Sequence, residues 1–150
     1  MTTFAFGRLR MFKGEFHGAK IMFGKARKLW TDGSKSENSY FVGACVYRLG
    51  CCYLDQPVPN AETAAKHLRE ALDITSLHRK HMPAEHARCL CRLAEALGFP
   101  GSETGNPLWQ EGKDKADEAR KIYSEQLCGW LPHNYPAASY YDRWVCIDWR

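Results

Sequence analysis

Two short stretches, Leu49-Gly-Cys-Cys-Tyr53 and Ala64-Ala-Lys-His-Leu68-Arg-Glu-Ala71, decide the fold class of this chain. In each stretch a small residue lies three or four positions from a large apolar one, the spacing that places both on one face of a helix. A small residue lets a neighbouring helix approach closely at that point. The intervening segment Gln56-Pro-Val-Pro-Asn60 is rich in turn formers, and its asparagine is a good N-cap for a following helix. These features predict two antiparallel helices at about 40–55 and 61–79.

Similar helix pairs are predicted on both sides of this one. Gly7, Gly50 and Ala94 stand in similar apolar surroundings, 43 and 44 residues apart, and a second helical pattern follows each of them. The first pair is expected at about 2–13 and 16–30, and the third at about 83–97 and 113–127.

We therefore expect one domain over residues 1–150. It would consist of repeat units at about 2–30, 40–79 and 83–127, followed by a C-terminal segment at 128–150. The polar segment 31–39 would link the first two units. Residues 98–112, rich in glycine and proline, would form a long loop inside the third unit.

The three units resemble the tetratricopeptide (TPR) repeat, and the second unit is also similar to the longer Sel1-like repeat. The resemblance lies in Leu49-Gly50-x2-Tyr53 and Ala64-x3-Leu68-x2-Ala71 of the second unit. The matching positions in the other units are Phe6-Gly7, Gly14, Ala19, Phe23, Ala26, Leu93-Ala94 and Ala119-x3-Tyr123. The resemblance implies an all-α fold: a right-handed α-solenoid of three helix pairs with an aromatic-rich C-terminal capping segment.

Composition narrows the setting in which such a fold would work. The formal net charge is only +4, and no apolar run is long enough for a signal peptide or a membrane span. The seven cysteines are odd in number, and most lie inside helical patterns, where cysteine behaves as a small apolar residue. We expect a reducing compartment, the cytoplasm or alternatively the nucleus, and no contact with a membrane.

The TPR resemblance implies that the first helices of the pairs line a concave groove that binds a protein or peptide. The residues expected on that face are Phe4, Arg8, Met11, Ala44, Tyr47, Arg48, Cys51, Leu54, Arg88, Cys91, Arg92 and Glu95. As ligand contacts we single out Arg8, Met11, Tyr47, Arg48, Cys51, Arg88, Arg92 and Glu95.

Four arginines make this predicted groove basic. A guanidinium grips a carboxylate bidentately, so an acidic or extended peptide is the expected ligand. Arg88 and Arg92 also match the two cationic places of the third unit in TPR domains that bind acidic chaperone tails, although the other places of that clamp do not match. Pairing of the arginines with local carboxylates such as Glu95 is the alternative.

A second cluster of polar residues surrounds the junction between the second and third units. His78, His81, Glu85, His86 and Cys89 carry groups that can bind zinc. Their spacing fits no established metal signature, so we expect no metal and no cofactor, and we interpret the cluster as capping the junction.

The alternative to a binding module is a small enzyme. The chain carries no nucleophile elbow, phosphate loop or dinucleotide fingerprint. Isomerase-like or cyclase-like acid–base chemistry would need Tyr47, His86, Arg92 and Glu95 to converge in a groove pocket closed by the C-terminal tail. Binding of nucleic acid is not expected, because the aromatic residues gather in the tail while the arginines lie in the repeats.

The C-terminal tail has two interpretations. It contains Trp130, Tyr135, Tyr140, Tyr141, Trp144 and Trp149, too many aromatic side chains to leave in water. We expect these residues to cap the apolar face of the last helix, since a terminal repeat has no neighbour to cover it. Alternatively, the tail enters a groove, either its own or that of a second copy in a homodimer.

Overall fold

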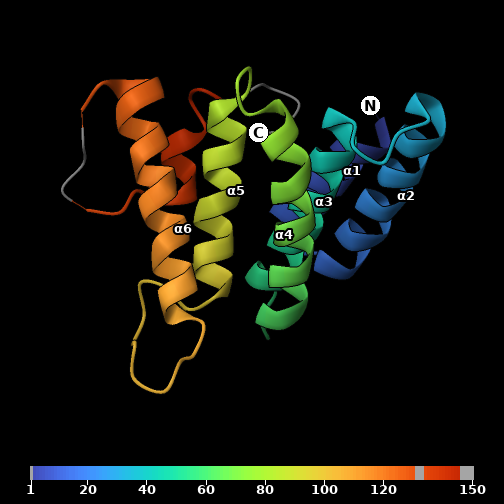
Figure 1. The fold of residues 1–150 in the computed structure, drawn as a ribbon. Coiled ribbons are helices and arrows are strands. Elements are labelled where there is room, and N and C mark those ends of the chain that lie inside the picture. The colour runs from blue at the N-terminus through green and yellow to red at the C-terminus, as the bar shows by residue number, and fades with distance from the viewer. Residues whose placement is uncertain (1, 131–133, 146–150) are drawn as a thin grey trace. The chain divides into compact units, whose positions relative to one another are not determined.

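A computed structural model describes residues 2–130 and 134–145, and within these ranges all regular secondary structure is helical (Figure 1). The α-helices are α1 (Thr2–Phe12), α2 (Phe16–Ser34), α3 (Tyr40–Asp55), α4 (Ala61–His78), α5 (Pro83–Ala96) and α6 (Trp109–Ile122). A π-helical turn, Tyr123–Cys128, continues α6, and a short 3₁₀ helix spans Ala138–Tyr141. The predicted all-α class is therefore confirmed. None of the helices in the described ranges has the length and apolar character needed to cross a membrane.

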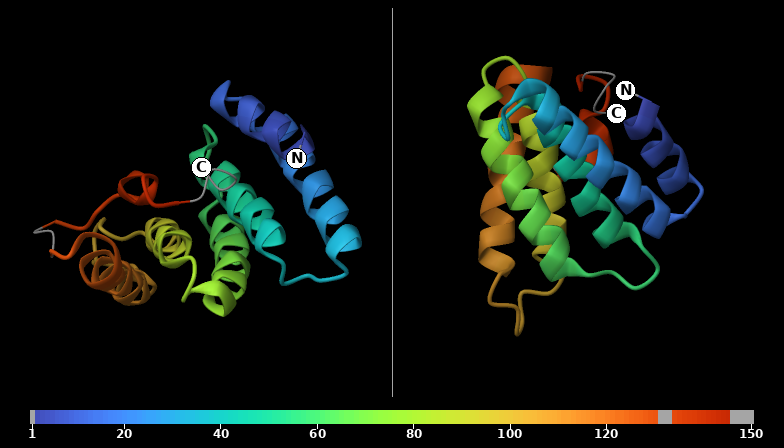
Figure 2. Two further views of the ribbon diagram at one scale, coloured as in Figure 1. Left: turned by 90° about the horizontal axis from the view of Figure 1, so that it is seen from above. Right: turned by 90° about the vertical axis from the view of Figure 1, so that its right-hand side faces the viewer.

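The helices gather into two units, Met1–Ile74 and Thr75–Arg150. The first unit holds α1, α2, α3 and most of α4, and Figure 2 shows α1 and α2 as a hairpin of antiparallel helices. The second unit holds the end of α4, α5, α6 and the tail. Each unit is described below by itself.

Both helix pairs of the first unit are built on the same close contact. A Cβ atom added to Gly7 of α1 would lie 2.8 Å from the Phe23 ring of α2. A Cβ atom added to Gly50 of α3 would lie 2.7 Å from Cγ of Leu68 in α4. In each pair a glycine therefore lets its helix approach a large apolar side chain of the next helix. Buried alanines flank both large residues, at positions 19, 26, 64 and 71.

The two helices of the second pair begin and end close to their predicted residues because local capping fixes them. The Ser39 hydroxyl accepts a hydrogen bond from the Val42 backbone N–H (3.4 Å) at the start of α3. Asn60 Oδ1 accepts one from the Thr63 N–H (2.9 Å), which confirms the predicted N-cap of α4. By contrast, α2 continues to Ser34, so the expected linker at 31–39 is shorter than predicted.

The third pair differs from its prediction at the start of its second helix. α6 begins at Trp109, four residues before the expected position, and Gly112 lies inside the helix rather than in the loop. A Cβ atom at Gly112 would lie 3.2 Å from the Ala94 carbonyl oxygen and 3.0 Å from Phe99 Cβ. This glycine therefore allows the close approach of α5 and α6, whereas the sequence pattern predicts that it ends the loop at 98–112.

The described part of the tail packs on the helices of the second unit. Tyr141 and Val145 are buried, and the Tyr135 hydroxyl donates a hydrogen bond to Asp117 of α6 (2.7 Å). The Tyr123 ring makes edge contacts with the rings of Tyr141 and Trp144. Within these ranges the tail thus covers helices of its own chain. Residues 131–133 and 146–150, and with them Trp149, lie outside the described residues.

Candidate functional site

The predicted groove residues fall into both units. Arg8, Met11, Tyr47, Arg48 and Cys51 belong to the first, while Arg88, Arg92 and Glu95 belong to the second. In the first unit Arg8 is exposed, whereas Tyr47 and Cys51 are buried. Met11 packs on the buried cluster formed by α2 and α3. The Arg48 guanidinium lies 5.7 Å from the centre of the Tyr47 ring, within range of a cation–π contact.

In the second unit the predicted guanidinium–carboxylate chemistry occurs with a carboxylate of the same chain. The Arg88 side chain is only 2% exposed, and its Nη1 donates to Asp142 Oδ1 of the tail at 2.7 Å. Arg92 pairs with Glu95, one turn further along the same helix. Cys91 Sγ donates to the Pro136 carbonyl oxygen (3.4 Å), and burial raises the pKa of this thiol to about 12. The predicted ligand-binding face of α5 therefore already holds a segment of the tail.

A pocket of about 370 Å³ lies in the second unit beside His86. The His86 ring is buried, with Nδ1 3.0 Å from the Thr75 hydroxyl and Nε2 3.9 Å from Glu118 Oε1. Removal from water lowers the pKa of this imidazole, although the Glu118 carboxylate acts in the opposite direction. The remaining lining residues are Arg79, Lys80, Pro83, Lys121, Ile122, Glu125 and Gln126.

Of the acid–base set expected from sequence, His86 alone lines this pocket. Arg92 and Glu95 are not among the lining residues, and Tyr47 belongs to the other unit. The lining also contains no residue of the tail, so this is not the tail-closed pocket that the enzyme alternative required. Among the residues that the structure describes, no three histidine, cysteine or acidic side chains are grouped to hold a metal ion.

α1 carries an exposed apolar surface that the sequence pattern did not predict. Phe6, Leu9 and Phe12 are 55%, 47% and 91% exposed, and Ala5 is exposed beside them. We call these four residues the α1 outer face; they follow one stripe of the helix, opposite the side on which Gly7 packs against α2. The available signal was that α1 carries large apolar residues all round, which is typical of a helix that is covered on every side.

Basic residues border the α1 outer face. Helical spacing places Arg8 along one edge and Arg10 along the other, and Lys13 follows the last turn. α1 itself contains no acidic residue. Arg10 does form an ion pair with Glu15 (3.2 Å), in which both side chains are about half exposed. Such a pair is screened by water, so the edges remain basic.

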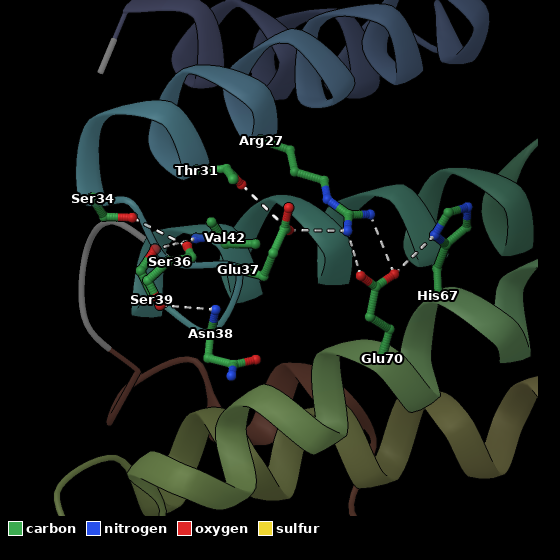
Figure 3. A network of polar contacts seen from close by, with 10 residues as sticks. All are labelled: Arg27, Thr31, Ser34, Ser36, Glu37, Asn38, Ser39, Val42, His67 and Glu70. Atoms are coloured by element: carbon green, nitrogen blue, oxygen red, sulfur yellow. Dashed lines mark hydrogen bonds and ion pairs between the residues drawn. The ribbon is translucent and has the colours of Figure 1, made fainter.

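A polar network, which the sequence did not reveal, joins α2 and the α2–α3 connection to α4 (Figure 3). Arg27 of α2 donates to Glu70 of α4 (2.6 Å) and lies 3.5 Å from Glu37 in the α2–α3 connection. His67 Nδ1 lies 4.0 Å from the second Glu70 oxygen. The Arg27 guanidinium and the Glu70 carboxylate neutralise each other. We therefore interpret the network as stabilising the fold and not as a binding site.

Two features of the described residues are considered further as candidates for function. The α1 outer face is apolar, exposed and edged by positive charge, and the His86 pocket is small and polar. Comparisons with protein-family models, with curated proteins and with solved structures find no match to this chain.

Proposed function

We propose that the chain is a protein-binding module of the helical-repeat type, an α-solenoid of three TPR-like pairs that binds an acidic partner segment in the cytoplasm or nucleus. The repeated contacts of Gly7 with Phe23 and of Gly50 with Leu68 support the repeat interpretation. The tail that covers α5 supports the predicted C-terminal cap. Right-handedness of the stack follows only from the TPR resemblance.

The observation that carries this function is the α1 outer face. Exposed apolar side chains that follow one helix stripe mark surfaces that bind other proteins, whereas scattered ones are ordinary. Phe12 is almost wholly in water although its helix is well formed. Burial of such side chains against a partner would contribute roughly 25 cal/mol per Å² of apolar surface.

The arginines of the predicted basic groove differ in their surroundings. Arg8 is exposed beside the α1 outer face and remains a candidate for binding a carboxylate. Arg88 and Arg92 already contact Asp142 and Glu95 in their own unit. We propose that the acidic partner segment is bound by the first unit, where Arg8 is exposed beside the apolar stripe of the α1 outer face.

Capture of partners from a cell extract on immobilised protein tests this function. Leu9→Ser should reduce the specifically captured protein about tenfold, because a partner buries this side chain. Leu77→Ser is the matched control, since Leu77 is an exposed leucine of α4 that is not part of the α1 outer face. Equal capture by wild type, Leu9→Ser and Leu77→Ser would exclude the α1 outer face as the binding surface.

A further inference from the structure

We propose that the α1 outer face receives a helix of a partner protein, which packs on α1 as α2 packs on α3 and carries acidic residues along its edges. This inference rests on the proposed protein-binding function and names the class of partner. It is drawn from the repeat register of the first unit and from the charges on α1.

The repeat register shows which positions of α1 should be covered. When Gly7 is aligned with Gly50, Phe6 and Leu9 correspond to Leu49 and Cys52 of α3. Leu49 and Cys52 are 8% and 0% exposed. Both belong to one buried cluster with Ala19 and Phe23 of α2. The positions that face the preceding helix in the second pair are therefore the ones left exposed in the first pair.

The first helices of the two pairs differ in how much of their surface other helices bury. α3 lies between α2 and α4 in the first unit, and most of its length is buried. α1 packs mainly on α2, with Met11 against the cluster of α2 and α3, and Gly7 is the one residue of Thr2–Phe12 that is fully buried. A helix laid on α1 in the way α2 lies on α3 would cover Phe6 and Leu9 and complete the packing of the first pair.

Side-chain size defines the apolar face of the docking helix. α2 presents Ala19 and Phe23, four residues apart, to Leu49 and Cys52. In α1 the matching positions hold the larger Phe6 and Leu9. To keep a normal distance between helix axes, the partner must therefore carry small residues such as alanine or glycine opposite them.

Charge defines the edges of the docking helix. Arg8, Arg10 and Lys13 surround the α1 outer face, and α1 has no carboxylate of its own. Glutamate or aspartate along both edges of a partner helix would therefore be attracted to the site. A second copy of this chain docking through the same face would bring these cations together, which argues against self-association at this surface.

Two synthetic helical peptides test the inference with the full chain. Both carry alanine at positions i and i+4 of one face, with leucine only at the borders of that face. The remaining positions are glutamate in one peptide and lysine in the other. Fluorescence anisotropy should show that the glutamate peptide binds at least about tenfold more tightly than the lysine peptide. This preference should shrink as salt is added.

Variants locate the binding of the glutamate peptide. Leu9→Ser and Phe12→Ser should each weaken it severalfold or more, whereas Leu77→Ser should leave it unchanged. Phe12 is 91% exposed, so its replacement removes a docking contact without altering the packing of the helix. Arg8→Glu should weaken the glutamate peptide and strengthen the lysine peptide. Circular dichroism checks that each variant retains its helix content.

Several outcomes would overturn the inference and leave the proposed function intact. One is that extract capture depends on Leu9 while the two peptides bind equally, or while neither binds. Another is a wild-type dimer in analytical ultracentrifugation that Leu9→Ser dissociates, because the occupant would then be a second copy. If extract capture does not depend on Leu9, the proposed function itself fails.

Discussion

At Gly50, α3 touches α4 without any side chain of its own between them. A methyl group there would lie 2.7 Å from Leu68 Cγ and 3.3 Å from the Ala64 carbonyl oxygen. We predict that Gly50→Ala destabilises the first unit by about 1–3 kcal/mol, because the overpacking outweighs the gain in helix propensity. Gly24→Ala is the control, since nothing lies within 4 Å of a Cβ there. It should stabilise by about 0.5–1 kcal/mol.

Urea unfolding followed by circular dichroism measures both glycine variants. Opposite signs for Gly50→Ala and Gly24→Ala would support the contact between α3 and Leu68. Equal stabilisation by the two substitutions would contradict it, because propensity alone would then explain both results.

His86 should make stability depend on pH. Burial lowers the pKa of its imidazole below the ordinary value, so the folded protein binds this proton less readily than the unfolded chain. The contribution of neutral His86 to the free energy of unfolding is therefore fully present above about pH 6.5. It is lost as the pH falls from there through the lower pKa of the folded state. The slope for one such group is at most about 1.4 kcal/mol per pH unit.

Urea midpoints measured from about pH 7.5 to about pH 5 test the role of His86. His86→Gln should reduce the loss of stability on acidification. Burial also lowers the pKa of His67, so this residue should account for part of the remaining pH dependence. In the double variant His86→Gln/His67→Gln, the free energy of unfolding should therefore change still less with pH. An unchanged slope in His86→Gln would show that this imidazole is protonated equally in both states.

At the scale of the helices, local sequence predicted what local interactions fix. α3 spans the predicted residues because Ser39 caps it and prolines follow it, and the Asn60 cap was visible in the sequence. The start of α6 was missed because Gly112 serves a contact with Ala94 and Phe99, and in a single sequence that glycine resembles a turn former. α2 extends four residues beyond its predicted end at residue 30. Near its end, the Trp30 ring stacks on the Phe41 ring of α3, with the ring centres 4.1 Å apart.

The surroundings of the candidate site residues could not be predicted, for a related reason. The sequence indicated that Arg88 would bind a carboxylate, but that carboxylate is Asp142, which lies far along the chain and could be assigned only from the fold. Likewise, Phe6, Leu9 and Phe12 were visible as apolar residues of a helix. Whether such residues are covered depends on which helices surround α1, and spacing alone does not encode this.

The attachment of the tail to α5 should depend on Asp142. Asp142→Asn removes the carboxylate that the buried Arg88 guanidinium contacts. We predict that it lowers the free energy of unfolding by about 1–3 kcal/mol. The tail should then detach from α5 more often and expose Cys91, whose thiol donates a hydrogen bond to the Pro136 carbonyl oxygen. Alkylation of Cys91, measured by mass spectrometry of peptides, should be faster in Asp142→Asn than in Asp114→Asn, where the aspartate contacts exposed Gln110 of its own helix. Equal rates would show that the ion pair does not hold the tail.

At the scale of the whole molecule, the central claim is that the chain binds a protein partner through α1. The repeated glycine contacts support the helix-pair architecture, and the uncovered side of α1 indicates where another helix would continue it. TPR membership, the handedness of the stack and a homodimer through the tail stay predictions. None of them is required for the α1 outer face to bind.

Amide hydrogen exchange of the full chain, with and without the glutamate peptide at saturation, tests this claim most directly. It reports protection helix by helix. We expect slower exchange along α1, Thr2–Phe12, and unchanged exchange in α6, Trp109–Ile122. Protection confined to α5 and α6, or exchange in α1 that the bound peptide leaves unchanged, would contradict it.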